Sequence, residues 1–332
     1  MDYPILPHIL PVIHVYWRVL RMLESIGWAI FSLIVYPGLL FSFILGGFYD
    51  WVKRKIEARA QSRRGPPWYQ SYADFFKLMF KEQIIPVTAS RYMILAPFIS
   101  LASLLLALLI IPFGFVNPPV SFMGDLIVLI YLLAVPSFTV VLAGSSSSSP
   151  YGSIGASREI SLLIAEELPF VISILSPAIV VGSLNFSEIV NYQLNHTWFL
   201  ILNPFAAVAL FICLIAKLSL RPFDIPEAEQ EIVAGPYTEY GGPLYGIFTL
   251  SNFVKWVIMG ALFSSLFLGG GDGLPSPWNV LWFLVKITLV VIVMALIHVA
   301  NARFRIDQAF KWYLTGILGL SFAGLILAII MV

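Results

Sequence analysis

Long apolar segments dominate this chain and restrict the folds open to it. Each is long enough to cross the ~30 Å hydrocarbon core of a bilayer as a helix. Eight can be drawn, at residues 25–49, 92–112, 122–143, 160–182, 198–217, 244–268, 278–300 and 313–331. A water-soluble protein could not bury a composition that is 59% hydrophobic and only 11% charged. We therefore predict an all-α, polytopic membrane protein with about eight transmembrane helices, forming a single membrane domain over residues 1–332.

Basic residues alternate between the two sides of this predicted bundle. Four connecting segments contain 15 of the 19 lysines and arginines: 50–91, 144–159, 217–243 and 301–312. The other connections and the C-terminal tail contain none. By the positive-inside rule, the basic segments are cytoplasmic loops and both termini lie outside, in a plasma membrane. No cleavable signal peptide is evident, because an acid and three prolines replace the basic region of a signal sequence.

The first cytoplasmic loop is long, basic and aromatic. Its charged run predicts a helix that stops before Gly65-Pro66-Pro67. Residues 70–82 predict a second, amphipathic helix, which either lies on anionic lipid or forms a docking platform for a soluble partner. The segment 144–149 is expected to be a flexible loop. Residues 8–22 predict an interfacial amphipathic helix or an extension of the first span.

The chain carries few residues that hold redox cofactors or metals. Cys213 is the single cysteine, which excludes an intrachain disulfide and an iron–sulfur cluster bound by this chain alone. Of the four histidines only His298 lies within an apolar span, so a bis-histidine haem is not expected. We predict no metal site and, with a net charge of +1, no nucleic-acid partner.

The segment 217–243 concentrates acidic residues beside the membrane. It holds five of the chain's 18 carboxylates: Asp224, Glu227, Glu229, Glu231 and Glu239. Like charges and poor solvation favour the protonated form, so some of these acids should keep a proton near neutral pH and could move charge. We expect Asp224 to cap a helix whose first turn contains Pro226, with Glu227 at the capping-box position. Alternatively, the acids only cap a short helix and pair with loop arginines.

Ionisable residues also lie inside or at the ends of the apolar spans. Glu166 and Glu167 fall within the fourth span, where a charge is costly and therefore a functional candidate. The alternative is a snorkelling acid, or one paired with Arg158 near the cytoplasmic face. Lys217 and Lys255 flank the acidic loop and could pair with it, whereas Lys286 lies deeper and could snorkel only with difficulty.

A further set of polar residues lies on the predicted cytoplasmic loops. The arginines of 301–312 could neutralise the acidic loop across the same membrane face, or simply anchor the loop at the membrane. We predict that a soluble partner docks on residues from three of the loops: Arg63, Arg64, Gln70, Asp74, Lys77, Lys81, Glu82, Arg221, Arg303, Arg305 and Asp307.

Four blocks in these loops resemble the family of the NADH-quinone oxidoreductase H subunit, also called NADH dehydrogenase subunit 1. They are RRGPP…FKE at 63–82, GSIGASREISLLIAEELP at 152–169, RPFDIPEAEQEIVAGPYTEYGGP at 221–243 and ARFRIDQAF at 302–310. The blocks occur in the family's order and with its eight-span topology. The resemblance covers essentially the whole chain after about residue 25.

The resemblance implies a membrane subunit that couples electron transfer in a peripheral arm to ion pumping. It implies peripheral iron–sulfur and hydrogenase-like subunits, antiporter-like membrane subunits and the lipid bilayer as partners, with ferredoxin acting indirectly. Iron–sulfur clusters, and a nickel–iron centre in some relatives, belong to those partners, so this chain is a non-catalytic subunit of an oxidoreductase. Glu227, Glu229, Glu231 and Glu239 match the family's loop acids, and Glu167 matches its intramembrane glutamate.

The chain departs from the quinone-using members in several places. Only Pro67–Tyr69 separates Gly65-Pro66 from Gln70, and Lys217 stands where an acid is usual. The short segment before Gln70 resembles the hydrogenase-type branch, which includes membrane-bound hydrogenases, sulfur reductases and formate hydrogenlyases. Three alternatives remain: a quinone-binding H subunit, a stand-alone secondary ion transporter, and a purely structural anchor. The transporter is disfavoured because neither an internal repeat nor a broken-helix pattern is visible.

Overall fold

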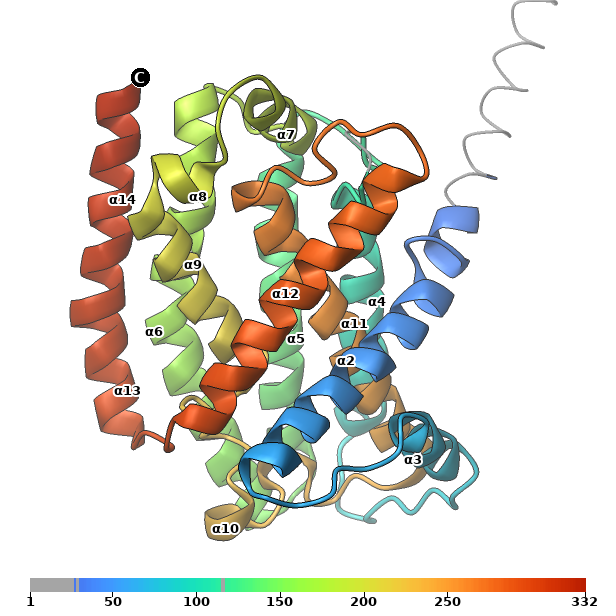
Figure 1. The fold of residues 1–332 in the computed structure, drawn as a ribbon. Helices are drawn as coiled ribbons and strands as arrows, with labels where there is room; N and C mark the ends of the chain where they lie inside the picture. The colour runs from blue at the N-terminus through green and yellow to red at the C-terminus, as the bar shows by residue number, and fades with distance from the viewer. Residues whose placement is uncertain (1–26, 28–29, 115–116) are drawn as a thin grey trace, which may run out of the picture.

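The computed structural model describes residues 27, 30–114 and 117–332, and every regular element within them is helical (Figure 1). The helix expected at 8–22 and the beginning of the first span lie outside the described residues. The elements are α2 (Leu39–Ala60), α3 (Gln70–Met79), α4 (Tyr92–Ile110), α5 (Asp125–Ser146), α6 (Pro150–Val181), α7 (Phe186–Asn195), α8 (Phe199–Leu202), α9 (Pro204–Lys217), α10 (Glu229–Ile232), the 3₁₀ turn η1 (Gly235–Tyr237), α11 (Gly242–Phe267), α12 (Trp278–Ala300), α13 (Ile306–Trp312), the π-helical turn η2 (Tyr313–Ile317) and α14 (Leu318–Met331).

Seven helical segments in the described part of the chain are long and apolar enough to cross a membrane. They are Ile30–Ala60, Tyr92–Ile110, Asp125–Ser146, Pro150–Val181, Gly242–Phe267, Trp278–Ala300 and Ile306–Met331. The polytopic, all-α class is thus confirmed. The short helices α3 and α10 lie at one end of the bundle, and α7 and the C-terminus lie at the other (Figure 1). We call these the α10 end and the α7 end.

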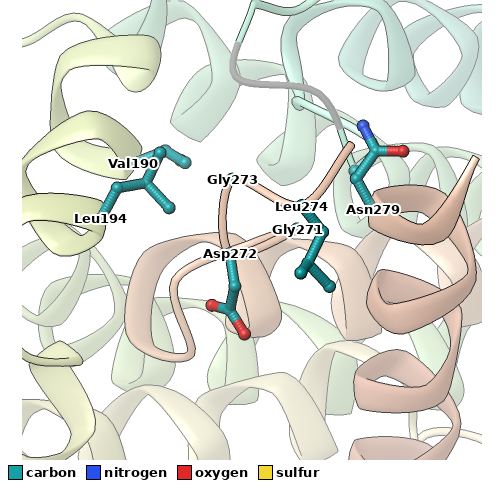
Figure 2. A pocket seen from close by; sticks show the side chains of 8 residues that line it. Val190, Leu194, Gly271, Asp272, Gly273, Leu274 and Asn279 are labelled. Atoms are coloured by element: carbon teal, nitrogen blue, oxygen red, sulfur yellow. The ribbon is translucent and has the colours of Figure 1, made fainter. Parts of the chain in front are cut away.

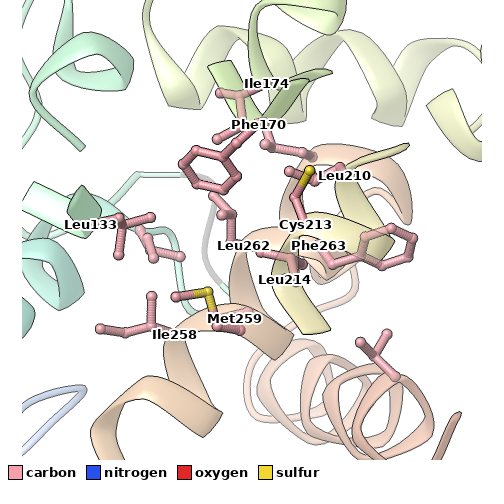
Figure 3. Close-up of a cluster of buried hydrophobic side chains, with 14 of the residues drawn as sticks. Leu133, Phe170, Ile174, Leu210, Cys213, Leu214, Ile258, Met259, Leu262 and Phe263 are labelled. Atoms are coloured by element: carbon pink, nitrogen blue, oxygen red, sulfur yellow. The ribbon is translucent and has the colours of Figure 1, made fainter. Parts of the chain in front are cut away.

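The helix α11 runs through the middle of the bundle, with almost all of its side chains buried. It packs against α2, α4 and α12. Gly46 permits the close crossing of α2 and α11, because a Cβ there would lie 2.1 Å from the carbonyl oxygen of Phe253. On the other side, Leu133, Phe170, Leu214 and Leu262 bring α5, α6, α9 and α11 into one apolar core (Figure 3). This core fixes the helices that carry the charged residues described below.

The fifth predicted span, 198–217, is not one helix. It is interrupted at Asn203, where α8 ends and the 14-residue α9 begins. The amide of Asn203 is buried, donates to Ser176 Oγ at 2.7 Å and to the carbonyl of Gly324 at 2.8 Å, and accepts a bond from the N–H of Ala206. The expectation that no broken helix is present was therefore wrong. Pro204 cannot donate a helical hydrogen bond, and the Asn203 side chain satisfies the freed groups inside the protein.

Two local predictions at the α10 end were also wrong. The segment 144–149 is not a flexible loop but the end of α5 and a three-residue turn, because α5 continues to Ser146 and α6 begins at Pro150. The segment starting at Asp224 is not a capped helix, since residues 221–228 form turns and α10 contains only four residues. Close packing of small residues explains the first difference: a Cβ on Gly152 would lie 2.9 Å from the carbonyl oxygen of Gly144.

An ionic clamp holds α3 against α2. Arg54 lies 3.0 Å from Asp50 and 2.9 Å from Asp74. Gln70 donates to the same Asp74 at 2.8 Å, and Ser71 donates to the buried Asp50 at 2.8 Å. The predicted amphipathic helix over 70–82 therefore exists, ends at Met79, and is fastened to the first span by charge as well as by packing.

Candidate functional site

A polar cavity of about 680 Å³ opens at the α10 end of the bundle. Three parts of the chain build it: the last turns of α2, the segment 219–227, and the connection from α12 to α13. Its lining consists of Lys53, Glu57, Gln61, Ser219, Arg221, Asp224, Glu227, His298, Asn301, Ala302 and Arg303. The acidic loop thus meets Lys53 of the first loop and Arg303 of 301–312, and only the second of these contacts was expected.

Ion pairs fix the wall of this cavity. Arg303 lies 2.7 Å from Asp224, and Arg221 lies 3.3 Å from Glu57. Burial raises the pKa of Asp224, although the bond from Arg303 opposes that rise. The backbone N–H of Arg221 donates to His298 Nδ1 at 2.9 Å, which ties the acidic loop to the end of α12. The predicted neutralisation of the acidic loop by 301–312 is confirmed for Asp224.

Two neighbouring glutamates of the acidic loop have opposite environments. Glu227 is half-buried, and burial together with the charge of Asp224 raises its pKa to about 7. Glu231 is exposed and lies 2.6 Å from Arg158, whose hydrogen bond lowers the pKa of Glu231. Because α10 begins only at Glu229, the two side chains do not share a helical face. Glu227 is therefore the acid of this loop suited to exchanging a proton near neutral pH.

Two buried groups of opposite charge lie outside the cavity lining, Glu159 on α6 and Lys255 on α11. Only 8% of Glu159 and 7% of Lys255 is exposed. Ser137 of α5 is close to Glu159, and Lys255 is within electrostatic range of both Glu159 and Glu227. These two groups connect the cavity electrostatically with the interior of the bundle.

Within the bundle, one lysine forms ion pairs with two acids. Lys217 Nζ lies 2.6 Å from Glu167 Oε2 and 3.2 Å from Glu166 Oε1. It also lies 4.9 Å from the centre of the Phe170 ring. The side chains of Lys217 and Glu166 are 1% and 3% exposed, and the second oxygen of Glu166 has no hydrogen-bond partner among the described residues. Lys217 thus pairs with the fourth span and not with the acidic loop, and Arg158 does not pair with Glu166 or Glu167.

These groups form one series, which we call the polar axis: Glu227, Glu159, Lys255, Lys217, Glu166 and Glu167. Each member lies within electrostatic range of the next. It begins at the cavity and ends among the helices of the transmembrane bundle. Charges in such a poorly solvated region interact far more strongly than charges in water. A change of charge at one member therefore alters the electrostatic energy of its neighbours in the series.

The remaining predicted residues lie outside the polar axis. Glu239 is half-buried beyond η1 and makes no ion pair shorter than 4 Å with any described residue. The backbone of Glu229 begins α10. Gln70 and Asp74 are engaged in the α3 clamp. Among the docking candidates, seven side chains are exposed: Arg63, Arg64, Lys77, Lys81, Glu82, Arg305 and Asp307.

Three functional candidates were missed from the sequence: Glu57, Glu159 and His298. Glu159 was assigned to a loop, although Ser149-Pro150 is a helix-start signal that would have put it inside a helix. Glu57 belongs to the charged end of α2, where its carboxylate is indistinguishable in the sequence from those of surface residues. His298 lies in an apolar span, and the sequence does not show that its side chain lines the cavity. The contacts of Glu57 and His298 with Arg221 join elements more than 70 residues apart.

Lys286 occupies a separate site at the α7 end. Its ammonium lies 2.6 Å from Asp272 and donates to the carbonyls of Leu268 and Gly270 at 2.5 and 3.0 Å. Trp198 covers it at 4.7 Å. Asp272 also lines a small cavity of about 220 Å³ beside Val190 and Leu194 of α7 (Figure 2). Lys286 is therefore an internal counter-ion of the loop after α11, and it does not snorkel.

Comparison with known proteins agrees with this architecture. The family model for NADH dehydrogenase matches residues 32–329. The H subunit of NADH-quinone oxidoreductase from Dehalococcoides mccartyi strain CBDB1 is 36% identical, over 89% of this chain and 85% of its own. Subunit 8 of the corresponding Thermus thermophilus enzyme is 37% identical, over 86% of this chain and 81% of its own.

A solved structure is similar over almost the full chain. It is a chain of the membrane-bound sulfane sulfur reductase, an archaeal respiratory membrane complex. The TM-score is 0.83 with 30% sequence identity, covering 92% of this chain and 99% of the other. The chain therefore belongs to the family of the NADH-quinone oxidoreductase H subunit and is part of a complex-I-related membrane complex.

Proposed function

We propose that this subunit anchors a peripheral electron-transfer arm to the membrane and couples its redox reaction to proton or sodium translocation. The electron donor would be reduced ferredoxin, and the acceptor a sulfur compound or protons. The similarity to a chain of the sulfane sulfur reductase complex supports the sulfur compound. The observation that carries the coupling role is the polar axis and, above all, the position of its last carboxylate, Glu167.

Glu167 is the member of the Lys217 cluster that reaches the outside of the bundle. Its side chain is 29% exposed, whereas those of Glu166 and Lys217 are almost fully buried. On the same helix it lies between Ile164 and Leu168, which are 59% and 56% exposed. An ionisable group facing lipid costs about 2.5–3.5 kcal/mol on insertion scales. A second membrane protein of the complex, with polar groups opposite Glu167, would remove that cost and receive the transferred charge.

The mechanism we infer is electrostatic. Reduction of a cluster in a partner subunit near the cavity would favour protonation of Glu227, whose pKa of about 7 makes it responsive at neutral pH. Loss of the negative charge on Glu227 would weaken its hold on Lys255 and strengthen the attraction of Lys255 for Glu159. The change would reach Lys217, which can share its charge between Glu166 and Glu167. A proton shift at Glu167 would then pass to the neighbouring subunit.

The redox centres belong, in this proposal, to the partners. An iron–sulfur cluster needs about four thiolates, and this chain offers one buried cysteine, Cys213. The α10 end would be cytoplasmic and would receive the peripheral iron–sulfur and hydrogenase-like subunits. The exposed residues Arg63, Arg64, Arg305 and Asp307 are the contacts we propose on that face, with Lys77, Lys81 and Glu82 beside them.

A quinone acceptor is the second candidate. It is favoured by the relatives named as H subunits of NADH-quinone oxidoreductase, one of which is 36% identical to this chain. Reduction of a soluble quinone by the purified complex would support it. Release of sulfide from a sulfur compound, with no quinone reduction, would support the first candidate.

The coupling role can be tested in the intact complex, reconstituted in liposomes. Glu167→Gln should leave electron transfer measurable when an uncoupler is present, and should abolish the ion gradient formed during turnover. Glu188→Gln is the matched control, because Glu188 lies in the first turn of α7, at the other end of the bundle. A normal gradient in Glu166→Gln, Glu167→Gln and the double variant would contradict the coupling role and would favour a purely structural anchor.

A further inference from the structure

Residues 76–92, which run from α3 into α4, present apolar side chains away from the bundle, and we call them the α3–α4 surface. α3 buries Phe75 on its inner face, whereas Phe76 and Phe80 lie on the opposite, exposed face. Phe80 is 89% exposed, and Ile84, just beyond the end of α3, is 72% exposed. A helix side that meets water normally carries polar residues. The outer face of α3 is therefore built to contact something apolar.

Hydrogen bonds to the rest of the bundle hold the α3–α4 surface in place. The N–H of Leu244, at the start of α11, donates to the side-chain oxygen of Gln83 at 3.2 Å. The hydroxyl of Ser148 donates to the carbonyl of Thr88 at 2.8 Å. The apolar residues exposed between these two bonds are Ile84, Ile85 and Val87. A fixed backbone therefore presents them, and they have no room to fold back onto the bundle.

The α3–α4 surface lies at the level where the bundle enters the membrane. Met79 of α3 packs on the first turns of the span α11, where a Cβ on Gly246 would lie 3.0 Å from Met79 Cε. The surface leads directly into the span α4, whose Leu95 and Phe98 are exposed on the outside of the bundle. α3 lies beside the bundle at its α10 end (Figure 1). Its outer face is therefore level with the boundary between acyl chains and headgroups.

Unpaired positive charge accompanies these apolar side chains. Lys77, Lys81 and Arg91 are exposed, and Glu82 is the only acid between residues 75 and 124. No ion pair within 4 Å joins these three cations to an acid in the described part of the chain. Long basic side chains can lay their stems along an apolar surface and extend their charged ends to the headgroups. The surface is thus complementary to lipid that carries negative charge.

We propose that the α3–α4 surface binds anionic phospholipid. Phe76 and Phe80 contact the upper part of the acyl chains, and Lys77, Lys81 and Arg91 bind the phosphate groups. The clamp between Arg54 and the acids of α2 and α3 holds the helix in the orientation that this contact requires.

A soluble protein fits this surface less well than lipid does. It would have to cover apolar side chains that lie level with the bilayer, where lipid is already present. The peripheral partner is then left with Arg63, Arg64, Arg305 and Asp307 as its proposed contacts. The inference does not depend on the coupling role of the polar axis, because none of these residues belongs to it.

Photo-crosslinking in the intact complex can identify what covers the surface. The complex is placed in nanodiscs made of equal parts of phosphatidylcholine and phosphatidylglycerol. p-Benzoylphenylalanine incorporated in place of Phe80 should give phospholipid adducts on irradiation, identified by mass spectrometry. The same residue in place of Arg64, on the proposed docking face, should give none. Adducts of position 80 with proteins alone, or equal lipid yields at the two positions, would overturn the proposal.

The headgroup preference is read from the same adducts. At position 80, phosphatidylglycerol should exceed phosphatidylcholine by about fivefold, the preference that one basic residue near an anionic surface gives. The triple variant Lys77→Gln, Lys81→Gln and Arg91→Gln should bring this ratio close to one. A ratio near one in the wild type would show that the surface does not select anionic lipid.

A matched triple variant removes the same charge from the preceding part of the loop. It consists of Arg59→Gln, Arg63→Gln and Arg64→Gln, three exposed cations that precede α3. This variant should keep the wild-type lipid ratio at position 80. Equal losses in the two triple variants would mean that the overall charge of the loop, and not the α3–α4 surface, attracts the lipid. The ion gradient, which tests the coupling function, is measured separately.

Discussion

The ammonium of Lys217 lies 2.6 Å from the carboxylate of Glu167, yet 1% of the lysine side chain and 29% of the glutamate side chain are exposed. The pair therefore joins the interior of the bundle to its surface. Glu166 competes for the same cation from the buried side, at 3.2 Å. One cation between two acids can pair with either of them, so the site has two arrangements. A proton taken up by one acid favours the pairing of Lys217 with the other, and the site can therefore act as a switch.

Replacing Lys217 by methionine should destabilise the protein strongly. Removing one partner of a buried pair leaves an uncompensated charge and typically costs about 3–5 kcal/mol. The measurement is the thermal unfolding temperature and yield of the purified complex, with Lys77→Met on the exposed face of α3 as control. Adding Glu166→Gln and Glu167→Gln should restore the stability without restoring coupling. An unchanged unfolding temperature in the single variant would contradict the ion-pair assignment.

The contributions of Glu227 and Glu231 to the stability of the α10 end should change with pH in opposite directions. The pKa of Glu227 rises from 4.5 to about 7 on folding, so its stabilising contribution is complete below pH 4.5 and is lost as the pH rises to 7. The pKa of Glu231 falls on folding, so its contribution is present above pH 4.5 and is lost on acidification.

Glu227→Gln should therefore flatten the decline in unfolding temperature between pH 4.5 and 7, and Glu231→Gln should not. The effect of Glu231→Gln should be below about 1 kcal/mol, because exposed ion pairs contribute little. An unaltered decline in the Glu227 variant would show that its carboxyl is solvated like an ordinary surface acid.

Arg54→Lys should loosen α3 without unfolding the bundle. Lysine has a single charged nitrogen, so it cannot bind Asp50 and Asp74 through separate nitrogens as Arg54 does. Because these groups are partly exposed, we expect a loss of only about 1 kcal/mol. Faster hydrogen exchange over residues 61–79, relative to an Arg59→Lys control, is the measurement. Equal exchange in the two variants would mean that packing alone holds α3.

Asn203→Ala should weaken the junction of α8 and α9. The change removes two donated bonds and one accepted bond at a site that is 1% exposed, at a cost of about 1–3 kcal/mol. Asn195→Ala is the control, because that exposed amide bonds only within its own helix, α7. Unfolding temperatures in the same detergent compare the two, and identical losses would argue against a special role for the break.

The sequence predicted the long spans well because their signal is local. Seven of the eight predicted spans correspond to long apolar helices, and the eighth differs where Asn203-Pro204 interrupts it. The helical state of 150–159 was missed because its glycines and serines resemble a loop in isolation. Their packing against one another and against Pro236 is what makes a helix favourable there.

The site was predictable in its members but not in its pairings. Glu166, Glu167, Lys217 and Asp224 were identified because a charge near an apolar span stands out in any sequence. Which cation meets which acid depends on the packing of α6 against α9, and the two residues of one such pair, Glu167 and Lys217, are 50 positions apart.

The packing of η1 against α6 gives an uncharged residue, Gly155, control over the position of part of the acidic loop. Gly155 has no side chain that could titrate or form a hydrogen bond, yet a methyl group added there would lie 2.6 Å from Pro236 Cδ and would displace the η1 turn of the acidic loop. A genetic screen for variants that respire but no longer store energy should therefore return glycines of α5 and α6 alongside the glutamates. Such mutants would show which close contacts at glycines the coupling depends on.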